Sequence, residues 1–380
     1  MHHLSRRDVL RAAAIAPFAL RAPTARGAEF TGMIVRQSEP QNLEMPFASL
    51  SDWIVPTERF YVRSHFPAPK IVPGDFKLVV EGHVNNPLEL TLDEVKKLGE
   101  EVKPLTMECA GNGRVFLAPA VRGLQWAHGA VGNANWTGIP LGALLERAKP
   151  KAGATEVVLS GADRGAIAAD PATPGPIPYS RSLPLAKAKK DETLLVWGMN
   201  GEPLTAAHGA PLRAMVGGWY GMASVKWLNR IVVTDRLFQG YFQTMDYSYY
   251  VRPTGADPET APVTEMLPKA AIARPGPGEV LPLGKPVTVF GAAWAGESRV
   301  DIVLLSSDGG RTWHEVKLLD KAKPFTWVLW KHEWTPKTAG PATLLVKCTD
   351  ARGRTTPEKR DADRRSYAIN HVIPVEVTVK

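Results

Sequence analysis

The chain has 380 residues, of which 44% are hydrophobic, and it carries a formal net charge of +8 at pH 7. Five arginines and one aspartate lie in residues 1–28, so the remainder has a net charge of about +4, which is not typical of a nucleic-acid-binding surface. The length predicts two domains or more, and nucleic acid is not expected among the partners.

The first 28 residues have the pattern of a twin-arginine export signal. Arg6 and Arg7 precede a short apolar run, residues 12–20, which is too short to span a membrane. Cleavage is expected near Gly27 or Ala28. The pattern predicts export of a folded protein to the periplasm, with a large prosthetic group already inserted and no membrane span in the mature chain. The alternative is an ordinary basic amphipathic N-terminus.

The next segment, residues 29–265, has the pattern of a mixed α/β domain with many loops. Short amphipathic helices are expected at residues 91–98 and 141–148. Thr91, with Glu94 three positions later, forms a capping-box pattern at the start of the first helix. Strand-forming runs are commoner than helical ones, and they occupy residues 76–80, 156–160, 193–197 and 230–233.

Prolines and glycines mark a break between about residues 261 and 282. Short strand-forming runs follow, separated by turn sequences such as Ser307-Asp308-Gly309-Gly310. The predicted strands are residues 286–292, 299–306, 312–318, 325–334, 342–350 and 372–379. This spacing predicts an all-β immunoglobulin-like sandwich over residues 266–380, and the whole chain is therefore assigned to the α+β class.

The chain has two cysteines, and their sequence surroundings differ. Cys348 lies in a predicted strand and is interpreted as a packed residue, so no disulfide between the two is expected. Cys109 is followed by Ala110-Gly111-Asn112-Gly113, a sequence that favours a tight turn. Arg114 would favour its thiolate, the form that binds metals. A reactive or metal-ligating thiol is predicted, and a small buried hydrophobe is the alternative.

Two further segments offer groups for an anionic ligand. Arg63 and His65 are two residues apart, so they would share one face of a strand; an exposed arginine at a strand end is the alternative. Glycine-rich sequence also surrounds four polar or basic residues: His208, Arg213, Ser224 and Lys226. Backbone N–H groups at the glycines and the basic side chains suit a phosphate, and a purely structural loop is the alternative.

Other catalytic patterns are missing from the sequence. It has no Walker A motif, no Gly-x-Ser-x-Gly and no His-Glu-x-x-His, and the lack of Cys-x-x-Cys-His excludes covalent c-type haem. Tyr247 lies in an aromatic cluster, residues 245–250, where its phenol is able to donate a hydrogen bond to a metal-bound oxygen. Core packing or a dimer surface is the alternative for this cluster.

Several of these segments, taken in order, resemble the sulfite oxidase family of molybdopterin enzymes. The resemblance rests on residues 60–69, Glu108-Cys109-Ala110-Gly111-Asn112, Gly123-Leu124-Gln125-Trp126, Gly132-Asn133-Ala134, and residues 199–204 and 208–227. Residues 291–294 and 307–313 look like that family's dimerisation domain, which implies a homodimer. With the twin-arginine signal and no haem motif, the chain is most similar to bacterial periplasmic haem-free sulfite dehydrogenases, which pass electrons to a separate cytochrome c.

The resemblance implies a molybdenum–molybdopterin cofactor and no haem in this chain. It implies that Cys109 ligates molybdenum, that Tyr247 is the active-site tyrosine, and that Arg63 and Arg114 bind a small oxyanion. It also implies the residues that hold the pterin and its phosphate: His65, Asp163, His208, Arg213, Ser224, Lys226 and Trp227. The expected reaction is oxidation of sulfite to sulfate, with electrons passed to an external c-type cytochrome.

The sequence departs from the family pattern at three places. Gly113 stands where many members have an arginine, and Ser64 stands where asparagine is frequent. The segment 366–371 lacks the Asn-x-Arg-Gly pattern that supplies an arginine to the substrate pocket in the family. Arg364 or Arg365 is the candidate replacement, and a less basic pocket is the alternative. These departures leave open another sulfur compound or a sulfoxide as the substrate. A non-enzymatic alternative is an exported immunoglobulin-like binding protein that has lost its cofactor.

Overall fold

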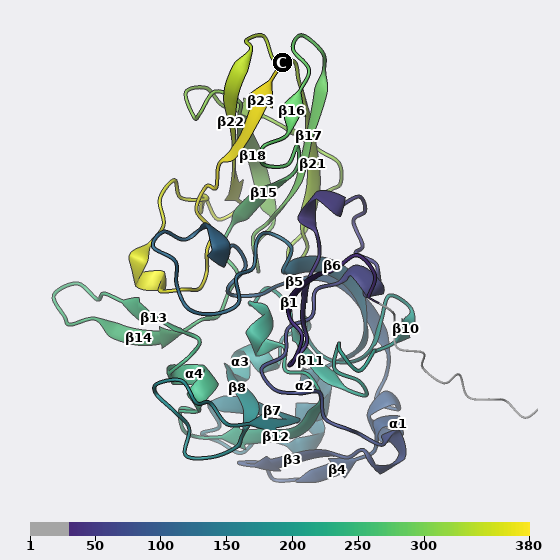
Figure 1. Cartoon of the computed structure of the whole chain (residues 1–380). Helices are drawn as coiled ribbons and strands as arrows, with labels where there is room; N and C mark the ends of the chain where they lie inside the picture. Colours follow the sequence, from purple (N-terminus) through teal and green to yellow (C-terminus); the bar gives the residue numbers. More distant parts are fainter. Residues whose placement is uncertain (1–29) are drawn as a thin grey trace, which may run out of the picture.

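The computed structural model describes residues 30–380, so the predicted export signal lies outside the described residues. Strands outnumber helices, and the chain forms a mixed lower part and an upper β-sandwich that contains the C-terminus (Figure 1). Within residues 30–380, no helix has the length and apolar character needed to cross a bilayer. The predicted order, a mixed domain followed by an all-β sandwich, is confirmed.

Two five-stranded sheets form the mixed part. The first is antiparallel and has the order β10–β9–β6–β5, with β11 also pairing with β9. Its strands are β5 (Glu101–Glu108), β6 (Val131–Pro140), β9 (Thr193–Met199), β10 (Glu202–Pro203) and β11 (Arg213–Val216). The second has the order β4–β3–β12–β7–β8, and only the pair β3 and β12 is parallel. Its strands are β3 (Leu78–Gly82), β4 (Leu88–Leu90), β7 (Glu156–Gly165), β8 (Ile177–Pro184) and β12 (Leu228–Thr234).

The helices are few and short, as the sequence predicts. The α-helices are α1 (Leu92–Lys96), α2 (Leu141–Ala148), α3 (Leu185–Ala188) and α4 (Tyr241–Thr244). Helix α1 begins with the expected capping box, because the Thr91 side chain accepts from the backbone N–H of Glu94 and the Glu94 carboxylate accepts from the backbone N–H of Thr91. Single 3₁₀ turns occur at Phe47–Ser49, Thr57–Arg59, Pro73–Asp75, Arg114–Phe116, Gly221–Ala223 and Ala362–Arg364.

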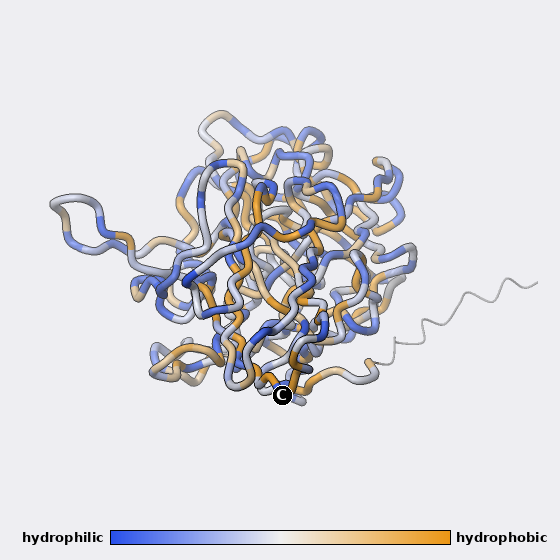
Figure 2. The backbone as a smooth tube through the Cα atoms, turned by 90° about the horizontal axis from the view of Figure 1, so that it is seen from above, coloured by the Kyte–Doolittle hydropathy of each residue, from blue (hydrophilic) through white to orange (hydrophobic). Residues whose placement is uncertain are grey.

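Two small hairpins complete the mixed part. One pairs β1 (Ile34–Gln37) with β2 (Asn42–Glu44). The other pairs β13 (Ser248–Val251) with β14 (Glu259–Pro262), and it projects away from the body of the molecule in both views (Figures 1 and 2). Many of the outer loops are hydrophilic in Figure 2, as expected for segments that run over the surface.

The C-terminal sandwich consists of a four-stranded and a five-stranded sheet. The first sheet contains β15 (Lys269–Arg274), β17 (Val287–Trp294), β21 (Val328–Trp334) and β20 (Lys317–Leu318). The second contains β16 (Val280–Leu281), β23 (Val375–Val379), β22 (Gly340–Asp350), β18 (Val300–Ser306) and β19 (His314–Glu315). Cys348 is a buried, unpaired cysteine of β22, so its predicted role as a packed strand residue is confirmed.

The prediction of one strand over residues 312–318 is wrong in one respect. The segment contains two short strands that belong to different sheets, since β19 pairs with β18 and β20 pairs with β21. Between them, the backbone N–H of Val316 donates to the carbonyl of Val303 while its side chain is buried. The chain therefore crosses from one sheet to the other at this residue, which its local hydrophobic pattern does not reveal.

The four-stranded sheet is buried on both faces where it meets the mixed part. In β17, Val289 and Ala293 belong to the interior of the sandwich, whereas Phe290, Ala292 and Trp294 pack into the core of the mixed part. This explains why the second half of β17 is hydrophobic without alternation. Strand β17 thus lies between two hydrophobic cores, one inside the sandwich and one in the mixed part, and contributes side chains to both.

Gly291 lies in this doubly buried strand, and a Cβ atom there would come within 2.0 Å of the carbonyl oxygen of Ala271. We expect Gly291→Ala to lower the free energy of unfolding by about 1–3 kcal/mol or more, because the backbone of the paired strand has to move. Gly175→Ala is the control, since nothing lies within 4 Å of a Cβ at that position. Thermal unfolding of both variants checks this, and equal melting temperatures would contradict it.

Candidate active site

A cavity in the mixed part brings together nearly all of the predicted site residues. It is lined by the segment 61–65, the end of β5, strands β7, β8 and β11, the loop before β11, the segment 221–227, and Tyr247. The predicted residues that line it are Arg63, His65, Cys109, Asp163, His208, Arg213, Ser224, Lys226, Trp227 and Tyr247. These residues come from positions between 63 and 247, so the cavity is assembled by the tertiary fold.

Cys109 reaches the cavity from a tight turn that follows β5. Its N–H donates to the carbonyl of Ala130, its carbonyl accepts from the N–H of Asn112, and Gly113 has a φ of 98°, which favours glycine. Burial raises the pKa of the Cys109 thiol, although Arg63 and Arg114 both act to lower it. The thiolate-favouring effect expected of Arg114 is therefore present, but burial outweighs it.

Arg114 does not line the cavity, although the sequence analysis places it there with Arg63. Its guanidinium lies where Cβ atoms on Gly111 and Gly123 would be, and it donates to the carbonyls of Ser366 and Leu124. The ring of Tyr367 lies 5.5 Å from its central carbon. Arg114 therefore connects the cysteine turn to the C-terminal segment, and its binding of a substrate anion stays a prediction.

Tyr247, which is buried, and His65, which is half-buried, form a hydrogen-bonded pair. Tyr247 Oη lies 2.7 Å from His65 Nε2, and the imidazole stacks on the ring of Tyr179 at a centroid distance of 4.5 Å. Burial, and then Arg63, lowers the pKa of His65 well below its usual value, while burial raises the pKa of Tyr247. A neutral imidazole and a neutral phenol follow, so the hydroxyl of Tyr247 donates to His65 Nε2.

One buried and two half-buried basic residues, Arg213, Arg63 and Lys226, give the cavity a positive character. Lys226 Nζ donates to Ser64 Oγ and to the carbonyl of Ala207, each at 2.8 Å. Burial, followed by the charge of Arg213, lowers the pKa of Lys226 well below its usual value. Burial also lowers the pKa of Arg213 to about 10. Cations that are destabilised in this way favour an anionic ligand, which would restore the charged forms.

The hydrogen bonds of the remaining cations are to neutral groups. Arg63 donates to Asn42 Oδ1 and to the carbonyl of Ser64. Arg213 donates to the carbonyls of His208 and Ser224 at 2.8 and 3.0 Å. Neither guanidinium contacts a carboxylate among the described residues. Neutral groups therefore fix the direction of these guanidinium N–H donors, and no carboxylate neutralises their positive charge.

Two buried polar atoms of the cavity have no hydrogen-bond partner among residues 30–380: Asp163 Oδ1 and His208 Nε2. The other ring nitrogen of His208 lies 2.9 Å from Thr205 Oγ1. Burial lowers the pKa of His208 to about 3 and raises the pKa of Asp163 to about 7. Buried polar atoms are seldom left without a partner, so these two atoms indicate a ligand with polar groups of its own.

The positions of Ser224 and Trp227 depend on local hydrogen bonds. Ser224 Oγ accepts from the N–H of Val216, which ties the segment to β11. Trp227 has a φ of 50°, and its indole N–H donates to the carbonyl of Ala206. Its ring lies 4.1 Å from Lys226 Nζ, a distance that allows a cation–π interaction.

Several residues of the cavity wall were not predicted from the sequence. Tyr61, Ser64, Met107, Tyr179 and Met222 also line it. Ser64 was noted only as a departure from the family pattern, yet its hydroxyl accepts from Lys226. Tyr179 comes from β8, a strand without a recognisable motif, so no local signal could have identified it.

The expectation that Arg364 or Arg365 enters the cavity is wrong. Arg364 pairs with Asp361 and lies over the ring of Tyr249, and Arg365 donates to Ser248 Oγ at 2.8 Å. Both arginines thus contact the projecting β13–β14 hairpin, and neither lines the cavity. An aromatic residue of the C-terminal segment lies beside Tyr247 instead: the ring centroid of Tyr367 is 4.9 Å from that of Tyr247.

Comparison with known proteins identifies both parts of the chain. The oxidoreductase molybdopterin binding domain matches residues 65–242, and the Mo-co oxidoreductase dimerisation domain matches residues 260–378. Mitochondrial sulfite oxidase of Drosophila melanogaster is 34% identical over 342 residues, which are 84% of this chain and 58% of that protein. Sulfite oxidase of Gallus gallus is 33% identical over 345 residues, 86% of this chain and 73% of that protein.

The fold is also similar to a solved structure. The sulfane dehydrogenase SoxCD from Paracoccus pantotrophus superposes with a TM-score of 0.76 at 24% identity, covering 95% of this chain and 94% of that one. This similarity supports the architecture of both parts. The chain spans only about three-fifths of the length of the fly relative, so that relative contains sequence with no counterpart here.

The raised pKa of Asp163 predicts a pH dependence of stability for protein produced without cofactor. The folded state holds a proton that the unfolded chain releases between its ordinary pKa of 3.8 and about 7, so stability falls as the pH rises through this range. We expect Asp163→Asn to be more stable than the wild type at pH 8, by up to about 4 kcal/mol, and equal to it below pH 4.

Denaturant unfolding of the cofactor-free protein at several pH values measures this difference. The exposed Asp235→Asn serves as the control and should follow the wild-type profile. An Asp163→Asn variant with the same pH profile as the wild type would show that the carboxyl group of Asp163 is not destabilised by burial.

Proposed function

The chain belongs to the sulfite oxidase family of molybdopterin oxidoreductases, and we propose that it oxidises sulfite to sulfate and passes the electrons to an external c-type cytochrome. The observation that carries this proposal is one cavity lined by the thiol of Cys109, the phenol of Tyr247 and three basic side chains, Arg63, Arg213 and Lys226. A soft metal ligand and an anion-binding wall are both needed for this reaction. The matched dimerisation domain supports a homodimer.

The residues of the cavity fit the molybdenum–molybdopterin cofactor that the family match implies. Residues 30–380 contain no group of three or more His, Cys, Asp or Glu side chains able to hold a metal ion. Most ligands of a metal bound at Cys109 would therefore come from the cofactor, whose pterin dithiolene supplies sulfur ligands. The atoms without partners, Asp163 Oδ1 and His208 Nε2, suit the polar edge of a pterin, and Arg213 and Lys226 suit its phosphate.

The protein's own groups would bind and orient the substrate anion. When bound, the molybdenum cofactor supplies oxygen-atom transfer and two-electron redox chemistry. Arg63 offers a planar fork of donors to an oxyanion at the cavity wall, which lowers the entropy cost of alignment. Tyr247 keeps its proton because burial raises its pKa, so its hydroxyl acts as a neutral hydrogen-bonding group in the cavity that Cys109 also lines.

Two sequence features support the proposed acceptor and location. The chain has no Cys-x-x-Cys-His motif, so it is not expected to hold a covalent c-type haem, and the cytochrome of the proposal is a separate protein. Arg6 and Arg7, which lie outside the described residues, form the twin-arginine pattern that predicts the periplasm. A folded, cofactor-loaded protein is the cargo of this export route.

A second candidate keeps the cofactor and changes the substrate to another reduced sulfur compound or a sulfoxide. The observation that favours it is the C-terminal segment: Tyr367 and the carbonyl of Ser366 lie against Arg114, and no arginine of this segment lines the cavity. A less basic pocket favours a substrate with less charge than sulfite. Turnover of sulfite, thiosulfate and dimethyl sulfoxide by the same preparation separates the two candidates.

Cys109→Ser should abolish sulfite-dependent reduction of cytochrome c, by at least 100-fold in kcat, while the protein stays folded. A serine hydroxyl is a poor ligand for a soft redox metal, whereas a thiolate is a good one. Steady-state kinetics with the bound molybdenum quantified in the same sample measures this change.

The second cysteine of the chain provides the matched control. Cys348 is buried and unpaired in the sandwich, and its N–H and thiol are both within hydrogen-bonding distance of Thr356 Oγ1. Cys348→Ser should therefore keep turnover within about twofold of the wild type, because it makes the same chemical change away from the cavity. Full turnover by Cys109→Ser would exclude Cys109 as the metal ligand.

Replacing Arg6 and Arg7 with lysine should stop export through the twin-arginine route. The charge of the N-terminus is unchanged by this substitution, so a general basic signal would still function. Cell fractionation, with molybdenum quantified in each fraction, checks the location. An unchanged periplasmic amount of the double variant would contradict the proposed route.

A further inference from the structure

A buried ionic cluster holds the turn that carries Cys109. Glu108, the last residue of β5, and Lys269, the first residue of β15, are each only 1% exposed. Lys269 Nζ lies 2.8 Å from Glu108 Oε1 and 2.9 Å from the carbonyl oxygen of Asn112. The lysine thus contacts residues on both sides of Cys109, from a strand of the dimerisation-domain match.

A tryptophan from the same region completes the cluster. The indole N–H of Trp294 donates to Glu108 Oε2 at 2.8 Å, and the Asn112 side-chain amide donates to Glu108 Oε1 at 3.0 Å. Asn112 Oδ1 in turn accepts from the N–H of Ala130. Each carboxylate oxygen of Glu108 therefore has a fixed donor, and a satisfied buried network of this kind permits one arrangement of the turn.

We infer that Lys269 and Trp294 are positioning residues that set the orientation of the Cys109 thiol in the cavity. This inference rests on the proposed role of Cys109 as the molybdenum ligand. The turn is held at Glu108, one residue before Cys109, and at Asn112, three residues after it, so these contacts restrict the positions that the cysteine can adopt. A shift of the turn would move the sulfur, and displacements of about 1 Å are enough to reduce catalysis strongly.

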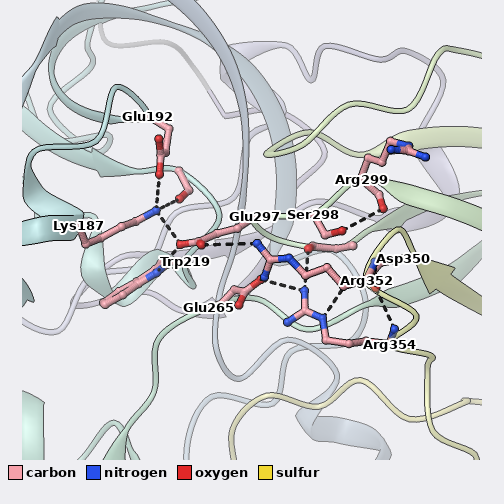
Figure 3. A network of polar contacts seen from close by, with 12 residues as sticks. Lys187, Glu192, Trp219, Glu265, Glu297, Ser298, Arg299, Asp350, Arg352 and Arg354 are labelled. Carbon is pink, nitrogen blue, oxygen red and sulfur yellow. Dashed lines mark hydrogen bonds and ion pairs between the residues drawn. The ribbon is translucent and has the colours of Figure 1, made fainter.

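A second cluster between the same two parts of the chain provides a control. Lys187 Nζ lies 2.8 Å from Glu192 and 2.7 Å from Glu297, and the indole N–H of Trp219 donates to Glu297 Oε1 at 3.0 Å (Figure 3). This cluster has the same chemistry: a lysine, a carboxylate and an indole donor across the junction. It makes no contact with the Cys109 turn among the hydrogen bonds of residues 30–380.

The decisive comparison is Trp294→Phe against Trp219→Phe in the cofactor-loaded enzyme. Each substitution removes one indole N–H that donates to a carboxylate and keeps an aromatic ring. Both should lower the melting temperature by a few degrees. Only Trp294→Phe should change the g-values of the Mo(V) electron paramagnetic resonance signal of chemically reduced enzyme. It should also lower kcat at least fivefold, with a smaller change in KM.

The lysines give a stronger version of the same test. Lys269→Met should change the Mo(V) signal further than Trp294→Phe does, whereas Lys187→Met should keep the wild-type signal. Wild-type signals and kcat within twofold in both Trp294→Phe and Lys269→Met would overturn the inference. If Lys269→Met fails to fold, Trp294→Phe alone decides.

Cys109→Ser separates this inference from the proposal on which it rests. A wild-type Mo(V) signal in Cys109→Ser would remove the ligand assignment and the inference together. A changed signal in Cys109→Ser, combined with wild-type signals in the Trp294 and Lys269 variants, would remove only the inference. Chemical reduction makes the readout independent of which sulfur compound is the natural substrate.

Discussion

The site is built on the burial of like charges around one cavity. Arg63, Arg213 and Lys226 lie within the protein with hydrogen bonds mainly to neutral groups, and Asp163 is the single carboxylate in the cavity wall. Burying cations without counter-ions costs free energy, which is visible as the lowered pKa of Lys226 and of Arg213. Anionic ligands offset this cost, so the strands and turns around the cavity serve to keep the charges in place until such ligands bind.

The parts of the structure that could be predicted from the sequence are those determined by residues that are close together in the chain. The capping box at Thr91 and the apolar face of α2 depend on residues a few positions apart in the sequence, and the structure contains both helices where they were expected. The turn after Cys109 follows from its glycines in the same way. The cavity residues were located by motifs that resemble a known family, because no local pattern brings positions 63 and 247 together.

The residues that could not be predicted depend on contacts distant in the sequence. Arg114 shares a motif with Cys109, yet its guanidinium is directed to the carbonyl of Ser366, 252 residues away. Arg364 and Arg365 look available in the sequence, but a hairpin more than 100 residues earlier occupies both. Hydrophobic alternation likewise fails where a strand is buried on both faces, as β17 is between the two cores.

The distance along the chain between Glu108 and Lys269 has a consequence for biosynthesis. During translation the cysteine turn emerges 161 residues before its lysine partner, and Ser366, which accepts from Arg114, emerges later still. Until then the carboxylate beside Cys109 has neither its ammonium nor its indole donor. The contacts that hold the turn around Cys109 therefore form only when nearly the whole polypeptide has left the ribosome. Cofactor loading consequently belongs after synthesis, and a product that terminates early contains the cysteine without the contacts that fix it.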